Sequence, residues 1–90
     1  MAKVIADPEE LKKFANYLKI RSYELQDKIR GIEYEFNNLS ENWKDPVHDK
    51  FKSELLESLR ALKQFVNVSI ETSQYLILKA EILERYLDLK

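Results

Sequence analysis

The residues that could carry chemistry are few, and most of them lie within residues 37–51. The only Trp, the only His and one of two Pro residues fall between Trp43 and His48. His48 lies close in sequence to Asp45 and Asp49, a combination that could suggest a metal site. One imidazole with two solvated carboxylates does not complete a metal's coordination shell. We therefore expect no bound metal and predict that His48 is an ordinary surface side chain.

Three serines are the other candidates for chemistry, as nucleophiles. A serine nucleophile needs a base within hydrogen-bond reach, and this chain has no Cys and a single His near one end of its predicted helices. Ser22, Ser69 and Ser73 fall at positions where we expect helices to pack, so they are predicted to allow close packing and to bond to backbone carbonyls. The sequence predicts no enzyme, no catalytic residue and no cofactor.

Composition favours one small domain built from long helices. The 90 residues are 44% hydrophobic and 34% charged, with one Gly and two Pro. The net charge of −1 comes from interspersed residues of both signs, so a nucleic-acid partner is not expected. Apolar runs are too short for membrane insertion, and Asp7, Glu9 and Glu10 stand where a signal peptide would be apolar. We predict a cytoplasmic protein whose export, where it occurs, needs no cleaved signal peptide.

Two helix starts can be read from Asp-Pro pairs. Asp7 and Asp45 can each cap free amides, and each precedes a proline suited to the first helical position. Residues 1–90 are therefore predicted to form one helical-hairpin domain, with helix 1 at about 8–41, a turn at about 42–45 and helix 2 at about 46–88. The turn motif consists of Trp43, Lys44, Asp45 and Pro46.

Heptad spacing predicts how the two helices pack. Steps of four and three residues from Leu11 and from Leu55 visit almost only apolar positions, which indicates an all-α, antiparallel two-helix hairpin. From the helix lengths we expect helix 2 to meet the far end of helix 1 near residues 75–79, and Ser22 to lie near residues 66–69. The two predicted seams are Leu11, Ala15, Leu18, Ser22, Leu25, Ile29, Ile32, Phe36, Leu39 and Trp43, and Leu55, Leu59, Leu62, Val66, Ser69, Ser73, Leu76, Ala80, Leu83 and Leu87.

Helix 2 carries more apolar residues than one partner helix can cover. Either these side chains fold over the hairpin seam, or they bind a second hairpin, identical or paralogous, to make a four-helix bundle; we favour the dimer. Phe14, Tyr17, Ile20 and Tyr34 lie off the first seam, and the sequence does not decide their role. The predicted partner interface consists of Phe51, Leu56, Phe65, Ile70, Tyr75, Ile77 and Tyr86.

The "DPEEL" opening at residues 7–11, the Trp between two helices and Phe51 early in the second helix resemble the WXG family of small helical-hairpin proteins. This ESAT-like family is associated with type VII secretion, and the resemblance covers nearly the whole chain. Where the family has Trp-X-Gly, this chain has Trp43, Lys44 and Asp45. Asp45 followed by Pro46 is expected to give a stiffer version of the same turn.

The resemblance implies a small secretion-system protein, a dimeric hairpin that is exported or acts as a targeting partner. A secretion ATPase or a larger toxin is then a further expected partner. The family's Tyr-X-X-X-Asp/Glu secretion signal is not matched, because Lys79 follows Tyr75 and Lys90 follows Tyr86 at the fourth position. The alternative is a cytosolic coiled-coil adaptor, or a structural interaction protein, that is not exported.

Overall fold

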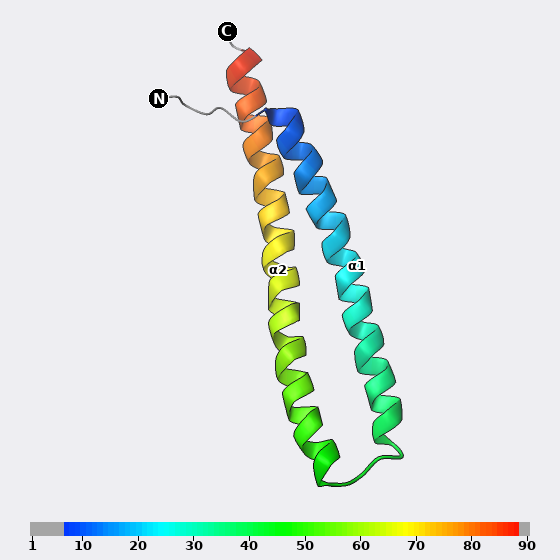
Figure 1. The fold of residues 1–90 in the computed structure, drawn as a ribbon. Coiled ribbons are helices and arrows are strands. Elements are labelled where there is room, and N and C mark those ends of the chain that lie inside the picture. Colours follow the sequence, from blue (N-terminus) through cyan, green and yellow to red (C-terminus); the bar gives the residue numbers. More distant parts are fainter. Residues whose placement is uncertain (1–6, 89–90) are drawn as a thin grey trace.

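The computed structural model describes residues 7–88, which form two antiparallel helices joined by one turn (Figure 1). Helix α1 spans Pro8–Ser40 and helix α2 spans Pro46–Asp88. The all-α hairpin predicted from the sequence is confirmed. Its extents of 68 × 25 × 13 Å describe a rod rather than a globule. Lys90, which follows Tyr86 at the fourth position, lies outside the described residues.

The ends of α1 are set by local hydrogen bonds. The Asp7 carboxylate accepts a bond from the Glu9 N–H at 3.0 Å, and Pro8 occupies the start of the helix, where no N–H is needed. At the other end, the Glu41 and Asn42 N–H groups bond to the carbonyls of Asn38 and Leu39, three residues back. This tighter last turn satisfies helix-end carbonyls before the chain leaves α1.

The hairpin core follows one line of heptad positions on each helix. The buried residues recur every seven residues, as expected where two helices share a straight seam. The alternate seam positions were predicted to be equally covered, and this was wrong for Ile32, Leu39, Leu62 and Leu87, which are exposed. Other residues of this second line are covered within the hairpin: Ser69 is buried, and Leu25 and Leu55 pack against the core. The buried heptad positions are Pro8, Ala15, Ser22, Ile29 and Phe36 on α1, and Leu59, Val66, Ser73 and Ala80 on α2.

Two ion pairs show the register of the helices. Lys12 Nζ lies 2.9 Å from Glu84 Oε2, and Lys63 pairs with Glu33. The bond to the Glu84 carboxylate raises the pKa of Lys12 above its ordinary value. Lys12 and Glu33 are 21 residues apart, as are Lys63 and Glu84, so the register holds over three heptads.

This register corrects the sequence-based prediction of where the helices meet. The far end of α1 lies beside Glu84, beyond the predicted residues 75–79, and Ser22 is level with Ser73 rather than with residues 66–69. The prediction placed the start of α2 directly opposite the end of α1. In the structure Ser40, the last residue of α1, bonds to His48, so the first turn of α2 extends past the end of α1.

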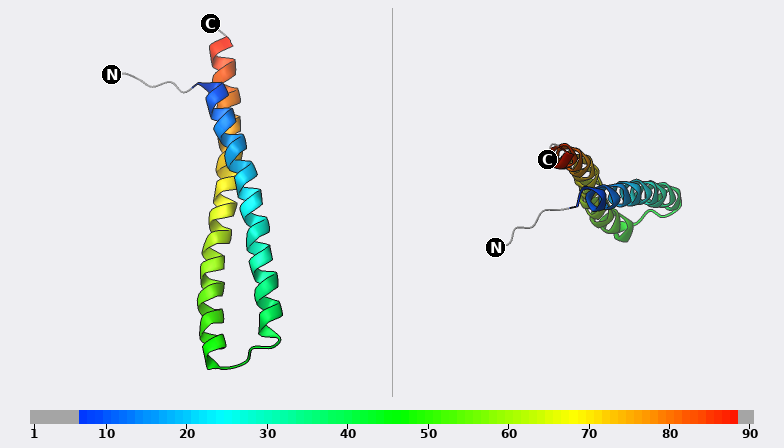
Figure 2. Two further views of the ribbon diagram at one scale, coloured as in Figure 1. Left: turned by 45° about the vertical axis from the view of Figure 1, so that its right-hand side comes forward. Right: turned by 90° about the horizontal axis from the view of Figure 1, so that it is seen from above.

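Side-chain size changes along the seam. Toward the chain termini the buried residues are small, with Ala15 and Ser22 on α1 and Ser73 and Ala80 on α2. Because the distance between packed helices depends on the side chains between them, small residues allow close approach. Toward the turn the buried residues are larger, and the two helices diverge there (Figures 1 and 2). This divergence explains why the outer seam residues near the turn stay exposed. The large buried residues are Ile29, Phe36, Leu59 and Val66.

Candidate functional site

Four rings gather where the turn meets the helices, and we call this group the aromatic tip: Phe36, Trp43, His48 and Phe51. The His48 ring stacks on Phe36 with centroids 5.4 Å apart, and Trp43 meets it edge-on at 5.1 Å. Phe51 tilts against Phe36 at 5.7 Å and against Trp43 at 6.2 Å. Aromatic pairs at these distances stabilise beyond their buried area. The half-buried Trp43 thus lies against the first two turns of α2.

Asp45 links Trp43 to the start of α2. Its Oδ1 accepts a bond from the His48 N–H at 2.9 Å, which caps the helix, and its Oδ2 accepts one from Trp43 Nε1 at 3.2 Å. The His48 N–H bond, with help from Trp43, holds the pKa of Asp45 below its ordinary value. Lys44 is exposed, and Pro46 begins the helix. None of the described residues has a positive φ, so the turn does not need the glycine of Trp-X-Gly.

His48 is buried, and the prediction of a surface side chain was wrong. Only 7% of the residue is exposed, because Phe36 and Trp43 pack against its ring. Its Nε2 lies 2.7 Å from Ser40 Oγ and its Nδ1 lies 3.2 Å from Asp49 Oδ1. Sequence spacing placed His48 near the start of a helix but did not show that Phe36, twelve residues earlier, would cover it.

Ser40, His48 and Asp49 have the connectivity of a Ser–His–Asp triad, which the sequence did not suggest. An acyl-transfer site also needs N–H donors aimed at a substrate oxygen, and the His48 N–H at this end of α2 is bonded to Asp45. The Asp49 carboxylate is mostly exposed, so burial does not hold it in place. We interpret the Ser40–His48 bond as a structural link between the two helices.

The seam serines have packing roles. Ser73 is fully buried, and its hydroxyl donates to the Ile70 carbonyl at 2.7 Å, the predicted kind of bond. Ser22 and Ser69 are also buried. Within residues 7–88 no group of three His, Asp or Glu side chains is placed to hold a metal ion. Over the same residues neither helix has a stretch apolar enough to span a membrane.

One side of the hairpin is apolar. A shallow groove between the helices near the turn is lined by Ile32 and Leu39 from α1 and by Phe51 and Leu55 from α2. Leu62 and Phe65 continue the same edge of α2, because they follow Leu55 and Phe51 by one and two heptads. We call the following exposed residues the apolar face: Ile32, Leu39, Phe51, Leu62 and Phe65, of which Phe65 is the most exposed at 56%.

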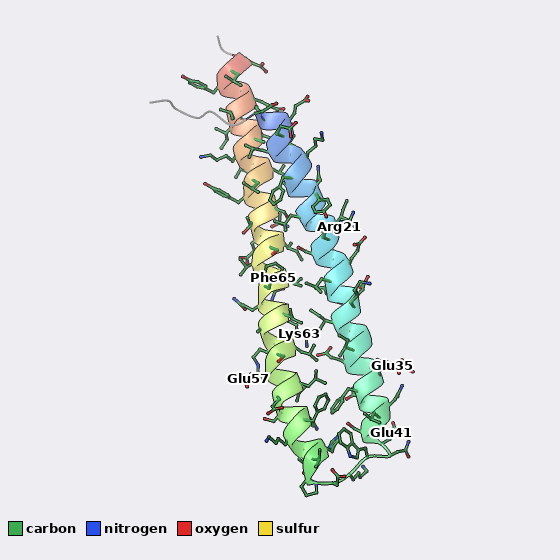
Figure 3. The ribbon with its side chains drawn as sticks, in the orientation of Figure 1. Arg21, Glu35, Glu41, Glu57, Lys63 and Phe65 are labelled. Atoms are coloured by element: carbon green, nitrogen blue, oxygen red, sulfur yellow. The ribbon has the colours of Figure 1, made fainter. Side chains whose placement is uncertain are left out.

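The opposite side of the hairpin is polar around the middle of the two helices. There the Glu33–Lys63 ion pair bridges the helices, and Gln26, Arg30 and Asn67 line the hollow beside it. Figure 3 shows Lys63 reaching into the space between α2 and α1. The two sides of the hairpin therefore differ in polarity. The exposed apolar area, which is the kind of surface that marks interaction sites, lies along the apolar face.

The seven residues predicted for the partner interface do not share one side. Phe51 and Phe65 lie on the apolar face, and Tyr86, three heptads after Phe65, continues the same edge of α2. The sequence had placed Ile32 and Leu39 inside the hairpin and so missed that they complete this face. Leu56, Ile70 and Ile77 share the heptad edge of Lys63 on the polar side, with Ile70 packed against the hairpin core, and Tyr75 lies exposed on neither edge.

The large apolar and aromatic residues of α1 that the sequence left undecided are all exposed. Phe14, Tyr17 and Ile20 wind around the outside of α1, and the Arg21 guanidinium lies 4.9 Å over the Tyr17 ring. Tyr34 lines the rim of the apolar groove. Of these four residues, only Tyr34 adjoins the apolar face.

The fold matches that of a secreted protein whose crystal structures are known. Neither a protein-family model nor a curated protein sequence matches the chain. Crystal structures of the secreted protein EsxB from Bacillus anthracis str. Sterne do match. One wild-type form is 30% identical over 90% of this chain and 93% of that chain, with a TM-score of 0.74. The chain belongs to the WXG family.

Other EsxB structures extend the likeness over more of this WXG hairpin. A selenomethionine form is 28% identical over 96% of this chain and 98% of that chain, with a TM-score of 0.79. A variant in which alanine replaces one proline reaches a TM-score of 0.83 at 28% identity, covering 94% of this chain and 96% of that chain. The fold is that of a family of small helical hairpins rather than that of an enzyme class.

Proposed function

We propose that this WXG hairpin is a small secreted protein that a type VII-like secretion system exports, or that it acts as a targeting partner for such a system. The observation that carries the proposal is its likeness to EsxB, described as a secreted protein, over nearly the full length of both chains. The proposed export uses no cleaved signal peptide.

Association through the apolar face is the second part of the proposal. Five large apolar side chains on that face are at least 39% exposed, a state that is unfavourable in water and is relieved when another apolar surface covers them. A second helical hairpin would complete a four-helix bundle, with Ile32, Leu39 and Leu62 in its interior. A secretion ATPase or a larger toxin would then contact the assembled bundle.

A cytosolic adaptor is the alternative function. The observation that favours it is Lys79, which stands at the fourth position after Tyr75 where the family's secretion signal has an acidic residue. Such an adaptor would use the same apolar face to bind the helices of another protein and would stay inside the cell.

Export can be tested in the cells that make the protein. The culture supernatant is assayed for the chain in cells with an intact type VII motor ATPase and in cells lacking it. We expect the protein in the supernatant of the first only, with a cytosolic marker enzyme absent from both. Retention inside cells that have the intact ATPase, at normal expression, would favour the adaptor.

Association can be tested on the purified chain by light scattering during size-exclusion chromatography across a dilution series. We expect a dimer of hairpins. A monomer at every concentration would mean that the apolar face binds a different chain.

A further inference from the structure

We propose that the Ser40 hydroxyl is a nucleophile that takes up one acyl group from a small activated ester, with His48 as its base. Together with Asp49 these residues form a site of covalent modification beside the turn, not a site of enzymatic turnover. The inference does not depend on export or on association of hairpins. It is carried by the two bonds of the His48 ring and by the hollow in front of Ser40.

The bonds of the His48 ring place its basic nitrogen against Ser40. Nδ1 lies 3.2 Å from Oδ1 of Asp49, and an ionised carboxylate only accepts hydrogen bonds, so Nδ1 carries the proton of the neutral ring. Nε2 is then the acceptor for the Ser40 hydroxyl, 2.7 Å from Oγ. A serine is activated by a base at this distance, and the base by a group that orients it. Because Phe36 and Trp43 pack on the ring, the imidazole already points toward Ser40 before an ester arrives.

A hollow of about 460 Å³ opens in front of Ser40 and His48. Ser40 is partly exposed there, so a small ester can reach its Oγ although the His48 ring is buried. The two carboxylates that line the hollow already accept bonds from His48. Lys44 and Lys52 are exposed at its edge. Their positive charges favour an ester whose leaving group departs as an anion, such as a phenolate or a phosphate.

The modification is a simple acyl transfer to oxygen. Oγ of Ser40 attacks the carbonyl carbon of the ester while Nε2 of His48 takes the hydroxyl proton. The bond from Oγ to the carbonyl carbon forms, and the bond from that carbon to the leaving group breaks. The leaving group departs with the electron pair of the broken bond, and the imidazolium gives its proton to water. Acylated Ser40 has no hydroxyl proton to donate to His48, so the bond that joins α1 to α2 is lost.

The absence of oxyanion donors limits both the rate and the number of turnovers. The His48 N–H, which lies at this end of α2, is bonded to Asp45 and is not aimed at an ester oxygen. General-base assistance alone accelerates a reaction by about 100-fold or more in a complete site, so we expect about tenfold here. The comparison is available in the same chain, because Ser53 and Ser58 are exposed on α2 and the only imidazole lies at Ser40.

The experiment follows acetylation of the purified full chain by p-nitrophenyl acetate at neutral pH. Lysines also react with this ester, so the acetyl group is quantified peptide by peptide with mass spectrometry. We expect Ser40 to be acetylated about tenfold or more faster than Ser53 and Ser58, although it is the least exposed of the three. His48→Gln should lower the rate at Ser40 to that of the other two serines. Equal rates at the three serines of the wild type would overturn the proposal.

Asp49 is a positioning residue, since it contacts Nδ1 of His48 and not the ester. Its side chain is 82% exposed, so Asp49→Asn should leave the helix content unchanged while it slows acetylation of Ser40 by about threefold or more. Asp27→Asn removes a similarly exposed carboxylate from α1 and should leave that rate unchanged. Nitrogen NMR should place the proton of the neutral His48 ring on Nδ1 in the wild type and on either nitrogen in Asp49→Asn. A wild-type ring that carries this proton on Nε2 would exclude His48 as the base.

Discussion

The Ser40 hydroxyl and the His48 imidazole Nε2 lie 2.7 Å apart, joining the last residue of α1 to the first turn of α2. The His48 ring is buried between Phe36 and Trp43, so water competes little for this bond. The bond therefore ties the turn to both helices, and the stability of the tip can be tested through these residues.

We expect Ser40 and His48 to be coupled in stability. Ser40→Ala removes one side of a partly buried hydrogen bond and should lower the unfolding free energy by about 1 kcal/mol. His48→Ala also removes the ring contacts and should lower it by about 2 kcal/mol or more. Urea denaturation of the single and double variants at one protein concentration gives the coupling energy, which we expect to be about 1 kcal/mol. Strict additivity would show that the bond contributes nothing.

Trp43→Ala should destabilise the hairpin by about 2 kcal/mol, because the indole is half-buried and contacts both His48 and Phe51. Trp43→Phe should recover much of this loss, since a ring remains against α2. Thermal unfolding monitored by circular dichroism measures both variants. An unchanged melting temperature in Trp43→Ala would assign the indole to partner binding instead.

Acid should weaken the tip through Asp45. Its folded pKa is lower than its ordinary value of 3.8, so its stabilising effect is fully present above that pH. The effect is lost as the pH falls through the lower folded value. In Asp45→Asn the amide oxygen can still cap α2 without titrating. The difference in stability between wild type and Asp45→Asn should therefore shrink below about pH 3.8, as urea denaturation at several pH values would show. A difference that stays constant down to the lowest pH would contradict this role.

Small residues should be required where the helices approach most closely. Ala80 is fully buried near the terminal end of the seam, so Ala80→Leu should force the helices apart and destabilise the hairpin by about 1–3 kcal/mol. Ala61→Leu is the matched control, since Ala61 is exposed on the same helix and leucine is also a good helix former. Equal melting temperatures of the two variants would show that the seam is loose at Ala80.

Phe65→Glu should weaken association more than it weakens the hairpin. Phe65 is 56% exposed on the apolar face, so a carboxylate there is hydrated in the monomer and would be desolvated in the dimer. Leu78→Glu places the same charge at an exposed leucine away from that face and serves as the control. Light scattering across a dilution series should show a monomer only for Phe65→Glu. Dimers of both variants at micromolar concentration would exclude this face as the interface.

Local chemistry and periodicity determined the elements of this protein. Asp7 with Pro8 and Asp45 with Pro46 start helices through bonds that span only a few residues, so helix starts can be read directly from the sequence. The heptad recurrence that includes Ala15, Ser22 and Ile29 likewise predicts the side of α1 that packs on α2, although it did not tell the buried line from the exposed one. Secondary structure and the hairpin class depend on such short-range relations.

Tertiary structure decided the register, the burial of His48 and the side on which the apolar face lies. The register of the hairpin depends on which residue of α2 lies level with the end of α1. The Ser40–His48 bond shows that this residue lies beyond Pro46. The buried side chains become larger from Ala80 to Leu59, so the helices lie further apart toward the turn. Ile32, which heptad spacing alone places in the seam, is therefore exposed. Heptad spacing shows that a residue is near a seam, but only the distance between the helices decides whether that seam is closed by the hairpin or left for a partner.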